Sequence, residues 1–447
     1  MSFQTRLLAN HLDLTALCKN KPEDYPYALV STSSSDARLR DRYDIFFAYP
    51  QESLISAKAG DGFLDSLDES WQKEKIRPQN SELPFTGGWF VYLAYEIAQE
   101  VEPTLVLPEV DELTANNHIP VAVARRCPAA IIVDHLENTT TAIAENEFAF
   151  LLDKIEQDVS LLTKTAPPEK INCNAITEAP EQPYLAQVKK IKRYIVDGDI
   201  FQANLSRPWL VEIEKEIDDV DIFNALAKSN PGSFAAFARL GDACLMSSSP
   251  ERLVQSRNGI VETRPIAGTR PRTVDSNDAA ISKELLEHPK EQAEHIMLID
   301  LERNDLGRVC KPGSVKVDEL MALESYQHVH HIVSNVRGII QDRLSPIDVI
   351  KAVFPGGTIT GCPKVRCMEI LSELEGEQRG AYTGSVGYIN RDGSMDLNIL
   401  IRTMIRAGDK ICFRAGGGIV ADSDPQRELE ETRAKAKGLV NIFNINS

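Results

Sequence analysis

The chain has 447 residues, of which 43% are hydrophobic and 26% are charged. This composition is ordinary for a globular protein in water, and the length is sufficient for two or three domains or for one large one. A formal net charge of −17 argues against a nucleic-acid or anionic-membrane partner, although a few local arginines can still bind a small anion.

The sequence shows no targeting or membrane-spanning segment. The first residues, MSFQTRLLANHLDL, lack the apolar run of a secretion signal, and no apolar stretch is long enough to span a membrane. The cysteines are scattered, and the one close pair, Cys362 and Cys367, fits neither a zinc site nor a C-x-x-C redox motif. We therefore expect a cytoplasmic protein with reduced thiols and without a membrane or nucleic-acid partner.

The first third of the chain is predicted to form short β-strands, because apolar runs occur at 27–33, 45–49, 121–126 and 129–134. The next segment, TAPPEKINCNAITEAPEQP, holds four prolines and little periodicity, which is typical of a connector. The predicted organisation is an N-terminal region at 1–164, a linker at 165–183 and a C-terminal region at 184–447.

The C-terminal region is predicted to begin with a helix and a strand. An apolar stripe at helical spacing covers 184–195. The following IFQANLSRPWL, at 200–210, alternates, so that Gln202, Asn204 and Ser206 share one face of a strand.

Further strands are predicted at 384–390, 397–405 and 410–416, and helices at 282–305, 363–375 and 425–443. Clusters of strands separated by clusters of helices predict an α+β fold, in which large antiparallel sheets form a sandwich covered by helices.

Two of these helices carry carboxylates that suit a hard metal ion. On the helix at 425–443, Glu428, Glu431 and Lys435 are spaced i, i+3 and i+7 and therefore lie on one face. The helix at 282–305 carries Glu294 on a largely apolar stretch. Taken alone, the first group is a solvated face with an ion pair; Mg²⁺ shared between the two helices is the alternative.

Glycine and arginine motifs indicate backbone contact with an anion. RPIAGTRPR, at 264–272, is predicted to be a loop fixed by proline and glycine. RAGGGIVADSDP, with Gly416 and Gly418, is either a tight turn between strand and helix or a close approach to an anion. PGGTITGCPK, at 355–364, is not an ATP loop, because Cys362 occupies the position of the essential lysine.

The order of the motifs resembles that of the chorismate-utilising enzymes. SSSPERL, TRPIAGTRPR, EQAEHIMLIDLERND, FPGGTITGCPKVRCMEIL, AYTGSVGYI and AGGGIVADSDPQRELEET follow one another across 245–437, and GDIFQANLSR extends the resemblance upstream. Motifs of this length in a fixed order are specific. The resemblance implies the family fold, a chorismate substrate whose ring bears two carboxylates, and Mg²⁺ as cofactor.

The resemblance also implies roles for individual residues. Glu251 matches the general acid that protonates the leaving hydroxyl. Glu294 and Glu431 match metal ligands, Glu428 supports the metal or its waters, and Lys435 neutralises the metal-bound carboxylate. The remaining matches lie around the substrate: Arg402, Tyr382, Gly416, Gly418, His331 and Thr358.

Two positions distinguish the reactions of this family. Isochorismate and salicylate synthases use a lysine to activate water where this chain has Gln202, a neutral amide that cannot act as a base. Ammonia is therefore the expected nucleophile. Many aminodeoxychorismate synthases carry a nucleophilic lysine at the position of Ala267. Anthranilate synthases carry alanine there, as this chain does. The resemblance therefore implies a catalytic set of Gln202, Ala267, Thr269 and Glu251.

The N-terminal region favours one of the two ammonia-dependent reactions. RYDIFFAYP and LPFTGGWFVYLAYE resemble the aminodeoxychorismate synthase branch, and the LLES element of the tryptophan pocket of anthranilate synthases is missing. We expect a lysine-free variant that aminates chorismate to 4-amino-4-deoxychorismate, for p-aminobenzoate and folate biosynthesis. Anthranilate synthase component I is the alternative. Since no glutaminase motif is present, ammonia is expected from a separate glutamine amidotransferase subunit.

Overall fold

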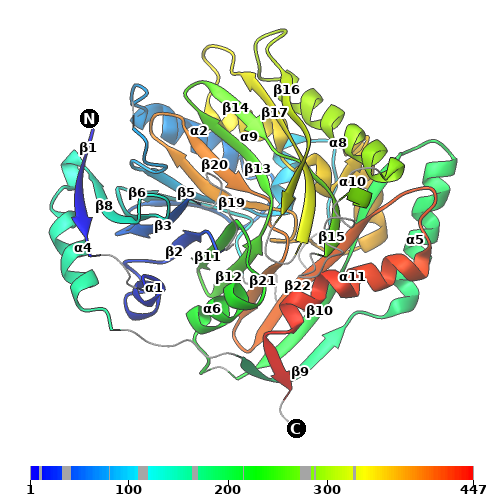
Figure 1. Cartoon of the computed structure of the whole chain (residues 1–447), viewed down its shortest axis with the longest axis horizontal. Coiled ribbons are helices and arrows are strands. Elements are labelled where there is room, and N and C mark those ends of the chain that lie inside the picture. The colour runs from blue at the N-terminus through cyan, green and yellow to red at the C-terminus, as the bar shows by residue number, and fades with distance from the viewer. Residues whose placement is uncertain are drawn as a thin grey trace.

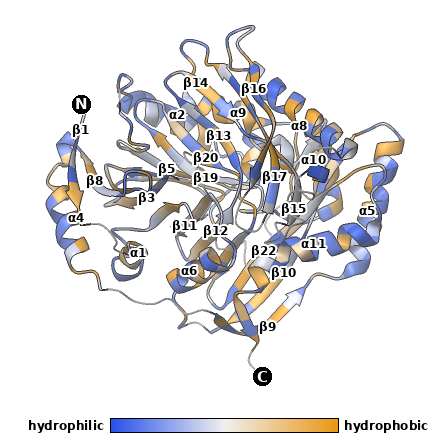
Figure 2. Ribbon diagram, in the orientation of Figure 1, coloured by the Kyte–Doolittle hydropathy of each residue, from blue (hydrophilic) through white to orange (hydrophobic). Residues whose placement is uncertain are grey.

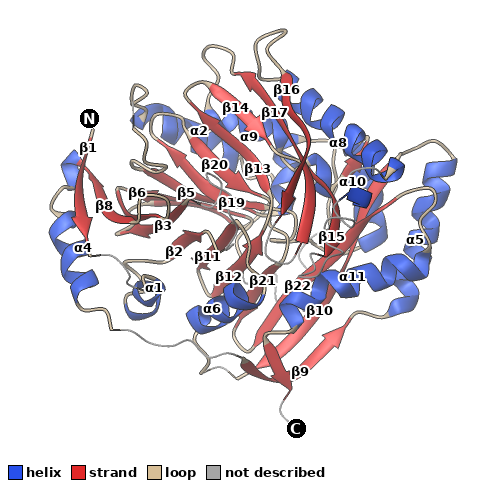
Figure 3. Ribbon diagram, in the orientation of Figure 1, coloured by secondary structure: helices blue, strands red, loops and turns tan. Residues whose placement is uncertain are grey.

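Figure 1 shows a computed structural model of the chain. It describes residues 2–445 except 10–12, 33–41, 80, 109–118, 164–169, 215, 272–282, 286–287 and 326–328. Two large sheets dominate this described part, and helices surround them (Figure 3).

The first sheet contains thirteen of the described strands, and every pair is antiparallel except β9 with β23. Its order is β1 (Phe3–Leu8), β8 (Thr139–Glu145), β7 (Ala129–Asp134), β3 (Tyr43–Ala48), β2 (Tyr27–Val30), β11 (Phe234–Leu240), β12 (Ala243–Ser249), β21 (Thr403–Ala407), β22 (Lys410–Ile419), β10 (Gln202–Ile213), β9 (Ile171–Glu178) and β23 (Phe443–Ile445), with β18 (Gly361–Cys362) also paired to β10.

The second sheet contains ten of the described strands, all paired antiparallel. Its order is β15 (Ile266–Pro271), β17 (Val329–Ile339), β14 (Ile260–Thr263), β13 (Arg252–Arg257), β20 (Met395–Asn398), β19 (Ser385–Asn390), β5 (Gly88–Leu93), β6 (Ala122–Cys127) and β4 (Ser53–Ser56), with β16 (Lys316–Ser325) paired to β17.

Helices cover the sheets, and those at the right of Figure 2 alternate between hydrophilic and hydrophobic stretches, as expected when one helix face packs on a sheet. The α-helices are α1 (Thr15–Asn20), α2 (Phe63–Glu74), α3 (Ala98–Val101), α4 (Leu151–Ser160), α5 (Glu181–Val196), α6 (Asp219–Ser229), α8 (Pro289–Gly307), α9 (Pro346–Val353), α10 (Lys364–Glu375) and α11 (Pro425–Val440). Short 3₁₀ turns are η1 (Tyr95–Ile97), η3 (Asn146–Phe148) and η4 (Gly357–Ile359).

The main core lies between the two sheets. Tyr27 of β2 stacks on Phe90 of β5 with ring centroids 4.0 Å apart, so the sheets meet face to face. Phe47 of β3 packs edge-on against the same Phe90 ring at 5.5 Å. All three side chains belong to one buried apolar cluster. The predicted sandwich of antiparallel sheets covered by helices is therefore confirmed.

The structure differs from the sequence prediction at the expected linker. Residues 171–178, expected within the connector, form β9, which pairs with β10 and β23. The expected regions also share both sheets, because β2 pairs with β11 and β5 pairs with β19. Hydrogen-bonded strands thus join the two sides of the boundary at 165–183.

The prediction of a loop at 264–272 is also wrong. Its residues 266–271 form β15, which pairs with β17 and carries a bulge at Gly268, where φ is +65°. Proline and arginine indicated a loop, but pairing with a neighbouring strand determines the path of the backbone.

None of the helices in the described ranges is both long and apolar enough to cross a membrane.

Candidate functional site

Three consecutive glycines of β22 form the floor of the site. The motif alone predicted either a tight turn or a close approach to an anion. In the structure Gly416, Gly417 and Gly418 lie inside the strand, opposite Ser206, Leu205 and Asn204 of β10, so the turn is wrong. A Cβ on Gly416 would lie 2.7 Å from the Tyr382 hydroxyl, and one on Gly418 would lie 2.1 Å from Nε2 of Gln202. The missing side chains therefore make room for the two polar groups predicted at the substrate.

The charged stripe of α11 faces this floor. The position of a Cβ on Gly417 lies 3.4 Å from Oε1 of Glu431, 3.5 Å from Oε2 of Glu428 and 3.7 Å from Nζ of Lys435. Lys435 donates to the carbonyl of Gly416 at 2.9 Å and pairs with Glu431 at 2.8 Å. Asp424 caps the start of α11 by accepting from two backbone amides, which fixes the helix over β22. The stripe is thus directed at the glycines and not only at solvent.

Glu251 lies in the connection between β12 and β13 and is 7% exposed. Thr358 of η4 donates to its Oε1 at 2.7 Å. Burial raises the pKa of Glu251 to about 7, although the hydrogen bond from Thr358 and the charges of Arg402 and Lys435 oppose the rise. A carboxyl group with this pKa can hold and release a proton near neutral pH, as a general acid must.

Arg402 lies between β20 and β21 in a backbone conformation with φ of +51°. Burial lowers its pKa, and the charge of Glu251 opposes that change. His331 of β17 is 3% exposed, and burial followed by the positive charge of Arg402 lowers its pKa to about 4. The imidazole is therefore neutral at physiological pH. It also hydrogen-bonds to the backbone of Gly268 on β15.

Ala267 and Thr269 lie on the backbone of β15, opposite Ile332 and His331. Their side chains are outside the described residues. The strand pairing therefore places these two predicted positions beside His331, and their contacts with a substrate stay a prediction.

Glu294 is half-buried on α8, which packs on β17 and β15, whereas α11 packs on β22 and α5. Within the described ranges, no three His, Cys, Asp or Glu side chains form a group that could hold a metal ion. Glu428 and Glu431 suit a hard cation, because two of their oxygens converge on Gly417. Glu294 is not brought into that cluster, and the three-carboxylate metal set stays a prediction.

Sequence reasoning missed a buried polar network behind the floor. Asn204 hydrogen-bonds to the hydroxyl of Tyr382 and donates from Nδ2 to the carbonyl of Ile359 at 3.0 Å. Arg379 donates to the carbonyl of Asn204 at 2.7 Å and forms an ion pair with Glu375. Two signals were available: Asn204 shares the predicted strand face of Gln202, and Arg379 lies two residues before the motif that contains Tyr382.

Glu302 of α8 was also missed, since LERND resembles an exposed end of a helix. It is 5% exposed, and burial, followed by the neighbouring Asp305, raises its pKa well above the usual range. A Cβ on Gly357 would lie 3.2 Å from its Oε1, so this second buried carboxyl group borders the η4 turn that carries Thr358.

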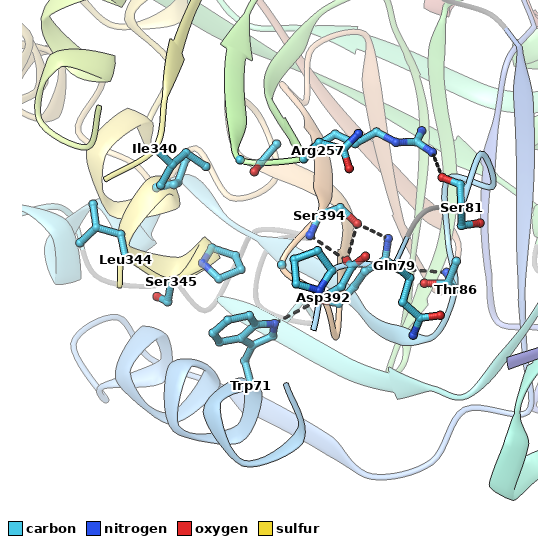
Figure 4. A pocket seen from close by; sticks show the side chains of 18 of the residues that line it. Trp71, Gln79, Ser81, Thr86, Arg257, Ile340, Leu344, Ser345, Asp392 and Ser394 are labelled. Carbon is cyan, nitrogen blue, oxygen red and sulfur yellow. Dashed lines mark hydrogen bonds between the residues drawn. The ribbon is translucent and has the colours of Figure 1, made fainter. Parts of the chain in front are cut away.

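A separate cavity of about 250 Å³ lies between α2, α9 and the turns that join β13 to β14 and β19 to β20 (Figure 4). Trp71 forms one wall and donates to the carbonyl of Asn390 at 3.0 Å, while Arg257 donates to backbone carbonyls at the opposite rim. None of the predicted site residues lines this cavity, so it is distinct from the candidate site.

A sandwich of large antiparallel sheets, with a buried acid that senses the charge of Lys435 over the glycine floor, suits an enzyme that binds a small anionic substrate. The model of the chorismate binding enzyme family matches residues 30–441. The chain belongs to this family and is a chorismate-utilising enzyme.

The relatives carry two names. An anthranilate synthase component I-like protein of Synechocystis sp. is 44% identical over 365 residues, which are 80% of this chain and 73% of the relative. Aminodeoxychorismate synthase component 1 of Bacillus subtilis is 38% identical and covers 89% of this chain and 87% of its own length. The crystal structure of anthranilate synthase component I from Streptococcus pneumoniae superposes with a TM-score of 0.78 at 31% identity, over 89% of this chain and 92% of that one.

Proposed function

We propose that this chain is component I of an aminodeoxychorismate synthase. It replaces the C4 hydroxyl of chorismate with an amino group from ammonia and releases water, forming 4-amino-4-deoxychorismate for p-aminobenzoate and folate synthesis. The neutral amide of Gln202 beside Gly418, at the position where water-using relatives place a lysine, supports ammonia as the nucleophile. Ammonia needs no base of that kind to act as a nucleophile. The N-terminal motifs RYDIFFAYP and LPFTGGWFVYLAYE favour the aminodeoxychorismate reaction over the anthranilate reaction.

Glu251 supplies the proton that the leaving hydroxyl requires. The new bond joins ammonia to the ring carbon, the C–O bond breaks, and the hydroxyl leaves as water with the proton of the carboxyl group. The raised pKa keeps much of this group protonated at neutral pH, and Thr358 holds its Oε1. The nitrogen, which is positively charged after the attack, then loses a proton, and this balances the proton that Glu251 gave to the leaving water.

The carboxylates of chorismate are bound by positive charge and by backbone amides. Lys435 and Arg402 supply the charge, and the open backbone of Gly416 to Gly418 lets amide groups approach the ligand. Glu428 and Glu431, with Glu294 as the further proposed ligand, would hold Mg²⁺. The metal would neutralise a substrate carboxylate in this acidic environment.

A separate glutamine amidotransferase subunit is the proposed source of ammonia. The names of the relatives, component I and component 1, support an enzyme that works with a further component. The cytoplasm is the proposed location, because the chain and its amidotransferase subunit would both act on small soluble metabolites there.

A second function, anthranilate synthase component I, is favoured by Ala267. Without a lysine at this position no enzyme–substrate adduct forms at C2, and ammonia is free to attack that carbon. The C4 hydroxyl would leave as water with the proton of Glu251, and elimination of pyruvate with loss of the C2 proton would then give anthranilate. One experiment separates the two reactions: purified chain is incubated with chorismate, Mg²⁺ and ammonium, and the product is identified. Aminodeoxychorismate becomes p-aminobenzoate only after a lyase is added, whereas direct anthranilate would overturn the proposal.

A further inference from the structure

The guanidinium of Arg379 is fixed on several sides. The residue follows α10, is 3% exposed, and donates from Nε and Nη2 to the carboxylate of Glu375, both at 2.8 Å. Its guanidinium carbon lies 4.9 Å from the ring centroid of Tyr95 and 5.6 Å from that of Tyr382. Such a planar fork holds a defined orientation because each of its edges has a partner.

The same guanidinium reaches two segments that carry predicted site residues. Nη2 donates to the carbonyl of Asn204 at 2.7 Å, and Nη1 donates to the carbonyl of Ile359 at 3.3 Å. Asn204 lies on β10, two residues after Gln202, and Ile359 directly follows Thr358 in η4. One side chain therefore joins β10, which begins at Gln202, to the η4 turn that supports the general acid.

Asn204 extends this link to the third segment. Its Nδ2 donates to the carbonyl of Ile359, and its side chain hydrogen-bonds to the hydroxyl of Tyr382, which lies over Gly416. The carbonyl of Ile359 thus accepts from both Arg379 and Asn204. Displacing the guanidinium would leave the bonds of Asn204 as the remaining links between β10, η4 and the tyrosine, and these segments would lose the side chain that fixes their relative placement.

We propose that Arg379 is a positioning residue for chorismate turnover, whose planar fork sets the relative placement of Gln202, Thr358 and Tyr382. It acts through these segments and not on the substrate. A lysine cannot substitute, because one ammonium on a flexible stem cannot satisfy a carboxylate and two carbonyls in fixed directions. The inference rests on the proposed function only through the role of Glu251, since both candidate reactions consume chorismate.

The test compares Arg379→Lys with Arg126→Lys. Arg126 of β6 is also buried and pairs with Glu145 and Glu74, but it lies outside the candidate site. With chorismate, Mg²⁺ and ammonium, kcat of Arg379→Lys should fall about 100-fold, as expected for misplaced reacting groups. KM for chorismate should change far less, and Arg126→Lys should keep its kcat while losing comparable thermal stability.

Chemical rescue supplies an independent readout. Arg379 lines a cavity of about 60 Å³ together with Tyr382 and Arg414, so Arg379→Ala leaves space for a guanidinium ion. Millimolar guanidinium, but not urea, should raise the rate of Arg379→Ala and leave that of the wild type unchanged. In Arg379→Lys the alkaline limb of activity should also move to higher pH, because a loosened η4 weakens the hydrogen bond with which Thr358 lowers the pKa of Glu251.

The proposal is overturned if Arg379→Lys keeps kcat within about twofold of the wild type, a change too small for misplaced reacting groups. It is also overturned if both variants at Arg379 unfold, which would make the arginine a residue of the fold alone. The rate is followed as chorismate consumption. A product other than aminodeoxychorismate would therefore refute the proposed function and leave the comparison of variants intact.

Discussion

At the scale of single residues, the carboxyl group of Glu251 combines burial with one strong hydrogen bond. Changing Glu251 to glutamine keeps its shape and removes its proton, so turnover should fall about 10²- to 10⁴-fold while chorismate still binds. In the wild type, activity should fall as the pH rises through about 7, because the acid ionises. Steady-state kinetics across pH, with calorimetry for binding, measure both effects.

Thr358→Val provides the matched comparison for that acid. Loss of the hydroxyl removes a hydrogen bond that lowers the pKa of Glu251, so the alkaline limb should move to higher pH. Identical pH profiles in the two proteins would contradict the role of Thr358.

A second prediction at this scale concerns the carboxylates proposed to hold Mg²⁺. Glu294→Gln and Glu431→Gln should each reduce ammonia-dependent turnover by several orders of magnitude. Without the metal, the substrate carboxylate would face the remaining acidic side chains with no compensating positive charge. Glu430 of the same helix, which pairs with Arg433, is the control, and Glu430→Gln should be nearly neutral. Near-wild-type activity of Glu294→Gln at saturating Mg²⁺ would refute its assignment.

Ala267 carries a third prediction. The backbone of this position pairs with Ile332 on β17, next to the pair of Thr269 with His331. An ε-amine introduced here would need a lowered pKa to attack ring C2. In an aminodeoxychorismate synthase, Ala267→Lys should be tolerated and should give an adduct visible by mass spectrometry after quenching with chorismate. The wild type should show only unmodified chain. Collapse of activity in the variant would instead indicate anthranilate chemistry at C2.

At the scale of elements, β22 shows why the glycine motif was only partly predictable. Three glycines before a helix are typical of a turn, and the sequence gives no direct sign that Gln202 and Tyr382 occupy the missing side-chain positions. That depends on the pairing of β22 with β10, two segments about 200 residues apart in the chain. The strand at 202–210 and the stripe on α11 were predictable, because periodicity is local.

The glycine floor can be tested directly. A Cβ on Gly416 would lie 2.5 Å from the carbonyl of Leu205 and 2.7 Å from the Tyr382 hydroxyl, and a backbone carbonyl cannot easily move away. Gly416→Ala should therefore reduce chorismate turnover at least about tenfold and lower the melting temperature. Gly307, at the end of α8, has open space around its Cβ position, so Gly307→Ala should leave activity unchanged. If Gly416→Ala and Gly307→Ala changed chorismate turnover equally, the glycine floor would have no specific role in activity.

At the scale of the whole molecule, the sandwich explains which predictions from sequence held. The fold class follows from the succession of strands and helices, and the family resemblance gave positions that the fold brings together: Glu251 with Thr358, and α11 with the glycines. The linker could not be recognised as part of a sheet, because β9 gains its order from β10 and β23 and not from its own composition. Arg379 and Glu302 escaped notice, since only burial distinguishes them from surface charges.

The source of ammonia is the last prediction, and it concerns the chain as a unit. Glutamine hydrolysis needs an activated thiolate beside an imidazole. Seven of the eight cysteines have a pKa raised by burial, which disfavours the thiolate, and the remaining one, Cys412, lies on β22 within the large sheet. The purified chain should therefore consume chorismate with ammonium and not with glutamine, as measured by product formation with each nitrogen source. Addition of a glutamine amidotransferase subunit should confer glutamine-dependent turnover. Glutamine-supported turnover by the single chain would instead reveal a glutaminase site within it.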